Sequence, residues 1–145
     1  PLSMELNLDI DKETDLVSLA QYYVNENNGH SRLIERLIDE TGIAREPTIN
    51  HKLLAKLPIS TYWTTNYDDL IEKSLDGEGK LADKKFTKNH LSQTKKGRSA
   101  IVYKMHGDAS VAEEAIITKD QYESYPVHNA PFVTDLSRDL DSKTF

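Results

Sequence analysis

Apolar residues recur at helical spacing in the first third of the chain, in three runs that each stop at a glycine or a proline. The runs are Leu16 to Val24 before Gly29, Leu33 to Ile38 before Gly42, and Leu53 to Leu57 before Pro58. Apolar positions three and four residues apart share one face of a helix, and glycine and proline commonly end one. Residues 1–57 are therefore expected to be mainly helical, with three amphipathic helices.

Beyond Pro58 the pattern changes to short runs typical of strands. Residues 59–65 are rich in β-branched and aromatic side chains, and residues 100–105 form a second run of this kind. Both runs favour strands. Each leads into a turn and then a helical pattern, and this succession predicts βα units with parallel strands. Residues 58–145 are expected to form an α/β portion.

The first predicted strand is followed by a predicted helix whose ends are marked by acidic residues and a glycine. Asp68 or Asp69 can serve as the N-cap, and Glu72 gives a capping-box pattern with Asp69. Gly77 is expected to end this helix. A last helix, which opens with a proline, is predicted over residues 131–140.

Polar residues stand directly after both predicted strands. Asn66 and Asp68 follow the first strand, and His106 follows the second. The ligand crevice of an open parallel sheet lies outside the carboxyl ends of its strands. These residues are therefore expected to meet at one edge of the sheet, around a shared pocket.

Two strings, TTNYDDLIE at residues 64–72 and KMHGD at residues 104–108, together resemble the SIR2-like family in its prokaryotic NAD-hydrolysing branch. In that family a strand-terminal Asn and Asp and a later His-Gly pair line the pocket for the nicotinamide and ribose of NAD. The resemblance covers roughly residues 50–136. Within it, residues 115–125 look like the strand and helix that follow the His-Gly pair.

The resemblance implies which residues form the site. Carried onto the matching positions, it makes Asn66 and His106 the candidate catalytic residues. It makes Thr65, Asn66, Asp68 and Gly107 the candidates for binding NAD.

The resemblance also implies a fold, a partial Rossmann-like parallel sheet flanked by helices. Members of the family carry a glycine-rich phosphate loop before this region and a Gly-Phe-Ser type turn after it. Neither has a counterpart in the sequence. Residues 1–145 are therefore expected to be an internal fragment of one larger SIR2-like domain.

Cleavage of NAD sets the tasks for these side chains. Loss of nicotinamide builds positive charge on the ribose, so an enzyme must hold the sugar and position a nucleophile. The amide of Asn66 suits the orientation of water or a ribose hydroxyl, and His106 suits the role of general base. Asp68 either binds the ribose or the nicotinamide amide or caps the next helix. Asn66 and His106 each have a structural alternative. Asn is common in strand-to-helix turns, and a single His after a strand is often a surface or turn residue.

Two further patterns invite a functional interpretation and are given a structural one. Residues 77–82 read GEGKLA and match a dinucleotide fingerprint, but they follow a predicted helix, so a helix end and a turn are favoured. Between Lys84 and Arg98 the chain carries only basic charges. A solvated loop is favoured there. The alternatives are a basic lip that attracts an anionic dinucleotide, a subunit contact or a nucleic-acid contact.

Composition narrows the class of protein. A chain of 145 residues with 37% hydrophobic and 29% charged residues fits one soluble globular domain. It has neither an apolar run of about 20 residues nor a signal-peptide pattern, so no membrane partner and a cytoplasmic location are expected. The net charge of −6 disfavours nucleic acid as a partner.

The absence of cysteine removes disulfides and thiolate metal sites. Protein-deacetylating sirtuins carry a four-Cys zinc module that this chain cannot build, which shifts the expectation from deacylation to hydrolysis of NAD itself. The other histidines show no metal-ligand spacing, so no metal is expected. They are His30, His51, His90 and His128.

Three functions follow from these observations. The first, which the resemblance implies, is hydrolysis of NAD as a substrate, by the effector of a prokaryotic antiphage defence protein that forms a homo-oligomer through parts beyond this chain. The second is a non-catalytic nucleotide-binding or scaffold module. The third is a zinc-free, sirtuin-like deacylase. The 145-residue chain alone is expected to have little or no activity, because half of the dinucleotide would lack partners.

Overall fold

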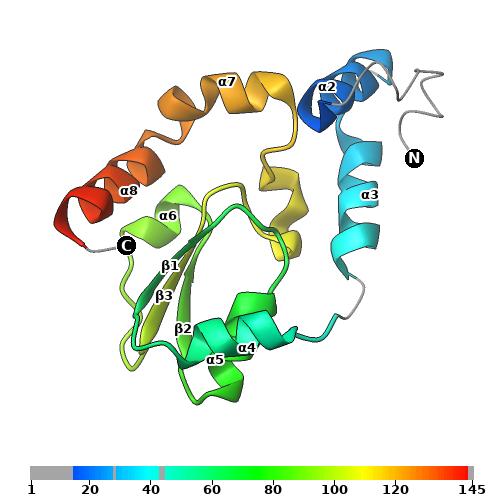
Figure 1. Ribbon diagram of the computed structural model, residues 1–145. Coiled ribbons are helices and arrows are strands. Elements are labelled where there is room, and N and C mark those ends of the chain that lie inside the picture. The colour runs from blue at the N-terminus through cyan, green and yellow to red at the C-terminus, as the bar shows by residue number, and fades with distance from the viewer. Residues whose placement is uncertain (1–14, 28, 43–44, 144–145) are drawn as a thin grey trace.

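The computed structural model describes residues 15–27, 29–42 and 45–143, which form helices around a small sheet (Figure 1). The strands are β1 (Thr61–Thr64), β2 (Ala82–Lys85) and β3 (Ala100–Lys104). The helices are α2 (Leu16–Glu26), α3 (Ser31–Gly42), α4 (Ile49–Lys56), α5 (Leu70–Gly77), α6 (Lys88–Leu91), the 3-10 helix η1 (Ala109–Glu114), α7 (Lys119–His128) and α8 (Ala130–Ser142). The predicted α/β class with helices in its first third is confirmed. None of the described helices is both long enough and apolar enough to cross a membrane.

The three strands are parallel and lie in the order β1-β3-β2. At the end of β1, Thr64 lies opposite Lys104 of β3, and at the end of β2, Lys85 lies opposite Tyr103. Parallel strands need crossover connections, and along the chain α5 lies between β1 and β2 and α6 lies between β2 and β3. The carboxyl ends of all three strands therefore meet at one edge of the sheet, where the loops after β1 and β3 begin.

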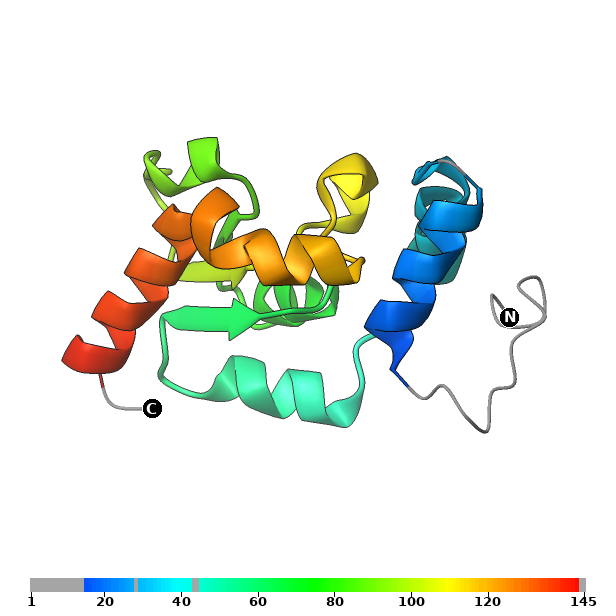
Figure 2. The same cartoon turned by 90° about the horizontal axis from the view of Figure 1, so that it is seen from above.

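Helices cover both faces of the sheet and make a three-layer arrangement. Alternate side chains of a strand point to opposite faces. On one face, Tyr62 and Val102 pack in the core formed with α4 and α5. On the other face, Tyr103 packs with Tyr125 of α7 and Phe132 of α8. Figure 2 shows β1 between α4 on one side and the pair α7 and α8 on the other.

Trp63 and Tyr67 each connect separate parts of the structure. The indole ring of Trp63 stacks on Tyr103 with 4.0 Å between ring centroids, and its Nε1 donates to Asp139 of α8 at 3.0 Å. The hydroxyl of Tyr67 donates to the carbonyl oxygen of Ile116 at 2.6 Å. Trp63 thus fastens α8 to the sheet, and Tyr67 fastens the loop after β1 to the segment before α7.

A second, smaller core joins α2 and α3. Ala20, Tyr23 and Val24 of α2 pack with Leu33 of α3, and Ile117 contacts this group. Figure 1 shows both helices beside α7 and η1. The apolar spacing that predicted these two helices identified their packing faces in part, because Leu16 and Ile38 at the ends of the two runs are exposed.

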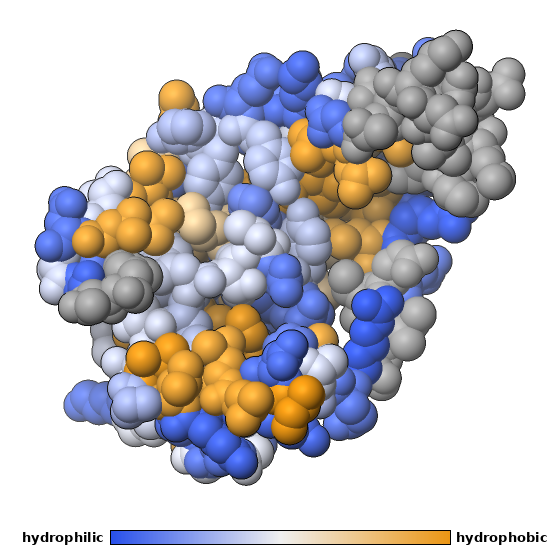
Figure 3. Space-filling view, in the orientation of Figure 1, coloured by the Kyte–Doolittle hydropathy of each residue, from blue (hydrophilic) through white to orange (hydrophobic). Residues whose placement is uncertain are grey.

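The apolar residues of α4 divide between the core and the surface. Leu54 and Ala55 pack against the sheet, whereas Ile49, Leu53 and Leu57 are exposed. In Figure 3 apolar side chains gather over the region where α4 lies in Figure 1. The helix predicted from its leucines is present, but only Leu54 of the three predicted positions packs inward.

The lysine-rich stretch predicted as a solvated loop is partly regular structure, so that prediction is wrong for β2 and α6. Lys85 in β2 lies 2.7 Å from Asp83, and both side chains are buried. The ammonium group of Lys85 also donates to the carbonyl of Gln93. Because a carboxylate on the same face of the strand neutralises the lysine, the strand can bury it.

The strand predicted within residues 115–125 does not form. This part of the chain, residues 115–118, lies outside the sheet, and its Ile116 N–H donates to the carbonyl oxygen of His106 at 2.9 Å. The segment thus pairs with the loop after β3 instead of with a strand. The helix predicted after it is confirmed as α7, which begins in a capping box between Thr118 and Gln121.

The capping box predicted for Asp69 and Glu72 is absent. Asp69 makes no side-chain cap hydrogen bond. The carboxylate of Asp68 accepts from the backbone N–H of Leu70 at 3.1 Å, so Asp68 is the one of the two predicted caps that bonds. Glu72 lies 3.6 Å from the buried ammonium group of Lys104. A buried opposite charge attracts a carboxylate more strongly than a solvated helix end does.

Residues 77–82 form a helix end and a turn, as predicted. α5 ends at Gly77, Gly79 adopts a φ of +71°, and β2 begins at Ala82. A dinucleotide fingerprint requires the opposite order, a strand that leads into a helix. The two glycines therefore serve the turn between α5 and β2.

Candidate functional site

The loops after β1 and β3 carry the predicted site residues and lie next to each other. Thr64 and Lys104 are paired at the ends of the two strands, so Asn66 and His106 each come two residues beyond a matched position. The backbone N–H of Met105 donates to the carbonyl oxygen of Thr64 at 3.0 Å. The register thus brings both motifs to one edge of the sheet, and their roles in binding and catalysis stay predictions.

Thr65 and Asn66 are exposed at this edge. The backbone N–H of Asn66 donates to Oγ1 of Thr64 at 3.0 Å, which closes a tight turn directly after the strand. The turn leaves the amide of Asn66 on the surface. An exposed carboxamide can both donate to and accept from a ligand.

His106 is half-buried in an aromatic setting. Its Nδ1 lies 3.1 Å from the hydroxyl oxygen of Tyr122, and its ring is T-shaped to the rings of Tyr122 and Tyr125 at centroid distances of 4.8 and 5.9 Å. Burial lowers the pKa of His106 from its ordinary value of 6.5. A neutral ring whose Nδ1–H donates to Tyr122 presents Nε2 as a proton acceptor.

Gly107 occupies a position that only glycine fits. Its φ is +102°, a conformation that side chains with a Cβ rarely adopt. A Cβ built here would lie 3.0 Å from the Cα of Ala115 and 3.3 Å from the carbonyl oxygen of Glu114. The glycine therefore lets the loop after β3 pass closely against the end of η1.

These features agree with what comparison with known proteins shows. A family model described as SIR2-like domain matches residues 60–145, which is more than half of the chain. The chain belongs to the SIR2-like domain family.

Relatives within this family are named NAD(+) hydrolase ThsA. The chain is 85% identical over 145 residues to the one from Acinetobacter baumannii (strain 532279), a match that covers all of this chain and 30% of that protein. It is 53% identical over 146 residues to the one from Bacillus cereus (strain MSX-D12), covering 100% and 31%. It is 48% identical over 143 residues to the one from Enterococcus faecium, covering 97% and 30%. The chain thus spans about a third of the length of these relatives.

Lys104, the first residue of the KMHGD motif, is a buried lysine for which the sequence predicted no role. The ammonium group of Lys104 donates to the carbonyl oxygens of Tyr67 and Asp68 at 2.9 and 2.5 Å, and it lies 2.6 Å from a carboxylate oxygen of Asp108. The side chain of Lys104 is 0% exposed. A sequence signal exists, because a lone charge in the apolar run 100–105 requires a buried partner.

The carboxylates of Asp108 and Glu72 lie beside Lys104 and balance its positive charge. Burial disfavours the charged form of Asp108, but hydrogen bonds from Lys104, Lys84 and Ser110 outweigh it and hold the pKa of its carboxyl well below the usual range. Burial raises the pKa of Glu72, and the charge of Lys104 opposes this shift. Within the described ranges, no group of three or more His, Asp or Glu side chains could hold a metal ion.

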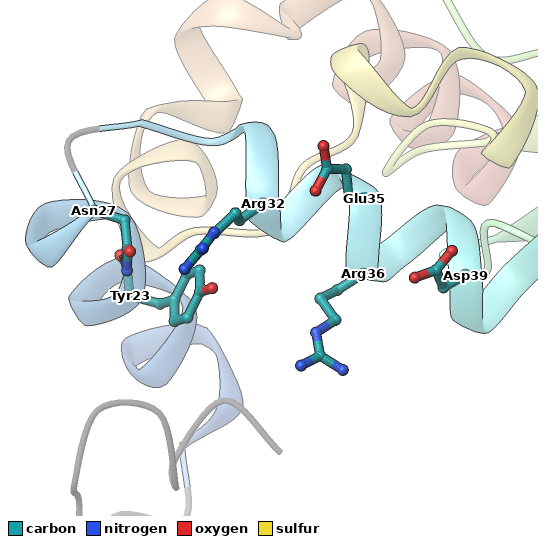
Figure 4. A pocket seen from close by; sticks show the side chains of 6 residues that line it. All are labelled: Tyr23, Asn27, Arg32, Glu35, Arg36 and Asp39. Atoms are coloured by element: carbon teal, nitrogen blue, oxygen red, sulfur yellow. Dashed lines mark hydrogen bonds between the residues drawn. The ribbon is translucent and has the colours of Figure 1, made fainter.

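Among the cavities outside these loops, two have volumes of about 600 Å³. One, of about 600 Å³, opens beyond the carboxyl end of β2 between α6 and η1, and its lining residues are Phe86, Thr87, Lys88, Asn89, His90, Gln93, Val111 and Glu114. The other, also of about 600 Å³, lies between α2 and α3 (Figure 4), and its lining residues are Tyr23, Asn27, Arg32, Glu35, Arg36 and Asp39. The first is on the side of the sheet where the strands end, which places it nearer to the SIR2-like motifs in the fold.

Proposed function

We propose that the protein carrying this chain is an NAD+ hydrolase that cleaves the bond between nicotinamide and ribose. The names of the relatives support the reaction, and the motif matches support the residues. The observation that supports the proposal is the register of β1 and β3, which pairs Thr64 with Lys104, so that the loops carrying Asn66 and His106 begin at one sheet edge. Cleavage of a glycosidic bond by water requires an orienting group and a base on the same sugar.

The reaction consumes NAD+ and water and gives nicotinamide, ADP-ribose and a proton. The bond between ribose C1′ and the nicotinamide nitrogen breaks, and its electron pair leaves with nicotinamide. Water then forms a bond to C1′ and loses a proton. In the proposed mechanism, Asn66 orients this water or a ribose hydroxyl through its amide, and His106 accepts the proton at Nε2.

The binding roles of Thr65, Asp68 and Gly107 are part of the same proposal. Thr65 is exposed beside Asn66. Asp68 already accepts one hydrogen bond from the backbone of α5, and a carboxylate has further lone pairs for a ribose hydroxyl. Gly107, without a side chain, lets a ligand approach the backbone closely.

The biological setting extends this proposal. The resemblance to the NAD-hydrolysing branch supports an effector of a prokaryotic antiphage defence protein that works in the cytoplasm as a homo-oligomer. We further propose that hydrolysis requires no metal, because the proposed chemistry uses only an amide, an imidazole and water.

The proposal is tested in a full-length protein, a chimera in which this chain replaces the 145 matching residues of the Acinetobacter baumannii relative. NAD+ is supplied under conditions in which that relative is active, and nicotinamide and ADP-ribose are quantified. The chimera is expected to release both in equal amounts. Binding of NAD+ without turnover would instead identify a scaffold, and consumption of NAD+ only with an acetyl-lysine peptide would identify a deacylase.

The dependence of nicotinamide release on pH gives a second test. Because the neutral imidazole is the proposed base, kcat/KM should fall as pH drops through the pKa of His106. Burial lowers this pKa, so the midpoint of the acid limb is expected below 6.5. A midpoint at or above that value, or the same limb in the residual activity of His106→Ala, would contradict the role given to His106.

A further inference from the structure

Three groups from two different loops converge on the ammonium group of Lys104. Two are the carbonyl oxygens of Tyr67 and Asp68, at 2.9 and 2.5 Å, in the loop after β1. The third is the carboxylate of Asp108, at 2.6 Å, in the loop after β3. Lys104 therefore connects the residue that follows Asn66 with the second residue after His106.

Lys104 has no donor left for a substrate. A lysine ammonium group carries three N–H donors, and the two carbonyls and the carboxylate account for all of them. Its side chain is 0% exposed, and Glu72 lies beside it at 3.6 Å. Any effect of Lys104 on a reaction must therefore pass through the loops that it holds.

The loops depend on this contact because their partners are hard to replace. Without the ammonium group, the carbonyl of Asp68 would lose its donor, whereas the carbonyl of Tyr67 would keep the backbone N–H of Ala109 at 2.9 Å. A polar group that loses its partner away from water is costly. Asp108 would keep Lys84, at 2.8 Å, as its remaining cation. The loop after β3 would thus stay anchored to β2. The loop after β1 would keep the bonds of Tyr67 to Ala109 and Ile116 but would lose the contact that joins the Asp68 carbonyl to Asp108 through Lys104.

We infer that Lys104 is a positioning residue that fixes Asn66 relative to His106. The catalytic consequence of this inference rests on the proposed NAD+ hydrolysis. The mechanical part, the coupling of the two loops, does not, and it can be measured whether or not turnover occurs.

A matched pair of substitutions in the chimera tests the inference. Lys104→Met removes the ammonium group that contacts both loops, and Lys85→Met serves as the control. Lys85 lies in the same sheet, is nearly as buried and forms an equivalent ion pair with Asp83, but it contacts neither motif. Below the unfolding temperature of each variant, Lys104→Met is expected to lower kcat by about 100-fold, the loss typical of a misplacement of about 1 Å. Lys85→Met should keep kcat within about twofold, as for a change that affects stability alone. Equal losses in both variants would overturn the inference.

A double-substitution cycle separates positioning from general damage. If Lys104 acts through Asn66, then Lys104→Met should cost little further activity in a chain that already carries Asn66→Ala, because coupled residues are not additive. A full additional loss of about 100-fold in the double variant would show that Lys104 acts by another route.

Hydrogen exchange of backbone amides tests the coupling without turnover. Lys104→Met is expected to speed exchange in residues 65–70 by about tenfold or more, while Lys85→Met leaves it unchanged. If Lys104→Met does not fold, Asp108→Asn retains the bonds of Lys104 to both carbonyls and weakens only the loop after β3. It should speed exchange in residues 106–110 more than in residues 65–70, and a uniform change in both segments would overturn the inference. An inactive chimera with the expected exchange pattern would reject the proposed function and retain the coupling.

Discussion

Replacement of His106 by alanine in the chimera is expected to slow nicotinamide release by about 10²–10⁴-fold, the usual contribution of a general base. Asn66→Ala is expected to lose about 100-fold or more, because water would no longer be oriented toward ribose C1′. The measurement is kcat at saturating NAD+, with the fold of each variant checked by its unfolding temperature. Both losses should appear mainly in kcat, since each residue acts on the reacting atoms more than on the bound dinucleotide.

Two substitutions of the same types provide the control for these variants. His128 at the end of α7 and Asn50 in α4 are exposed and belong to neither loop. Their alanine forms should retain kcat within about twofold, as is usual for surface positions. Full activity of either Asn66→Ala or His106→Ala would remove that residue from the mechanism.

Gly107→Ala is expected to destabilise the chimera and to slow nicotinamide release together. A residue with a Cβ at this positive φ lowers the free energy of unfolding by about 1–3 kcal/mol. The contact of that Cβ with the backbone of Ala115, at 3.0 Å, adds a further overpacking cost of about 1–3 kcal/mol. Because relief of this contact moves the loop that carries His106, kcat should fall even where the variant remains folded. Denaturant unfolding and kcat measured on the same preparation check both effects.

Gly79→Ala is the control for Gly107→Ala. Gly79 also has a positive φ, +71°, but a Cβ there would meet nothing within 4 Å. Gly79→Ala should lower the free energy of unfolding by about 1–2 kcal/mol, through backbone conformation alone, and leave kcat unchanged. Equal effects of the two substitutions would show that the close approach of Gly107 to Ala115 has no influence on the site.

Local patterns in the sequence identified most of the elements around the site. The helices before Gly29 and Gly42 and the strands around Tyr62 and Val102 were predictable because apolar spacing records which face of an element is buried. Asn66 and His106 were predictable as neighbours because two βα units imply parallel strands. Parallel strands place their carboxyl ends at a common edge.

The sequence did not predict which partners hold the buried charged side chains. Lys85 is neutralised by Asp83, only two positions away, so the two oppositely charged residues can be recognised as a pair in the local sequence. Lys104 is held by carbonyls 36 and 37 positions earlier in the chain, and backbone carbonyls exist at every residue. The lone lysine in an apolar run and Asp108 four positions later indicate a buried ion pair, but the side-chain pattern does not reveal which carbonyls also bind the lysine. The role of Asp68 is similar, because a helix cap and a ribose ligand both require a carboxylate at that position.

The position of Trp63 gives the chain an optical probe of its own. It is the only tryptophan among the 145 residues, and its ring lies flat on Tyr103 while its N–H reaches Asp139. Release of α8 from the sheet would bring water to the indole and shift its fluorescence to longer wavelength. Emission from a single side chain thus reports whether this helix is docked, without any label and without NAD.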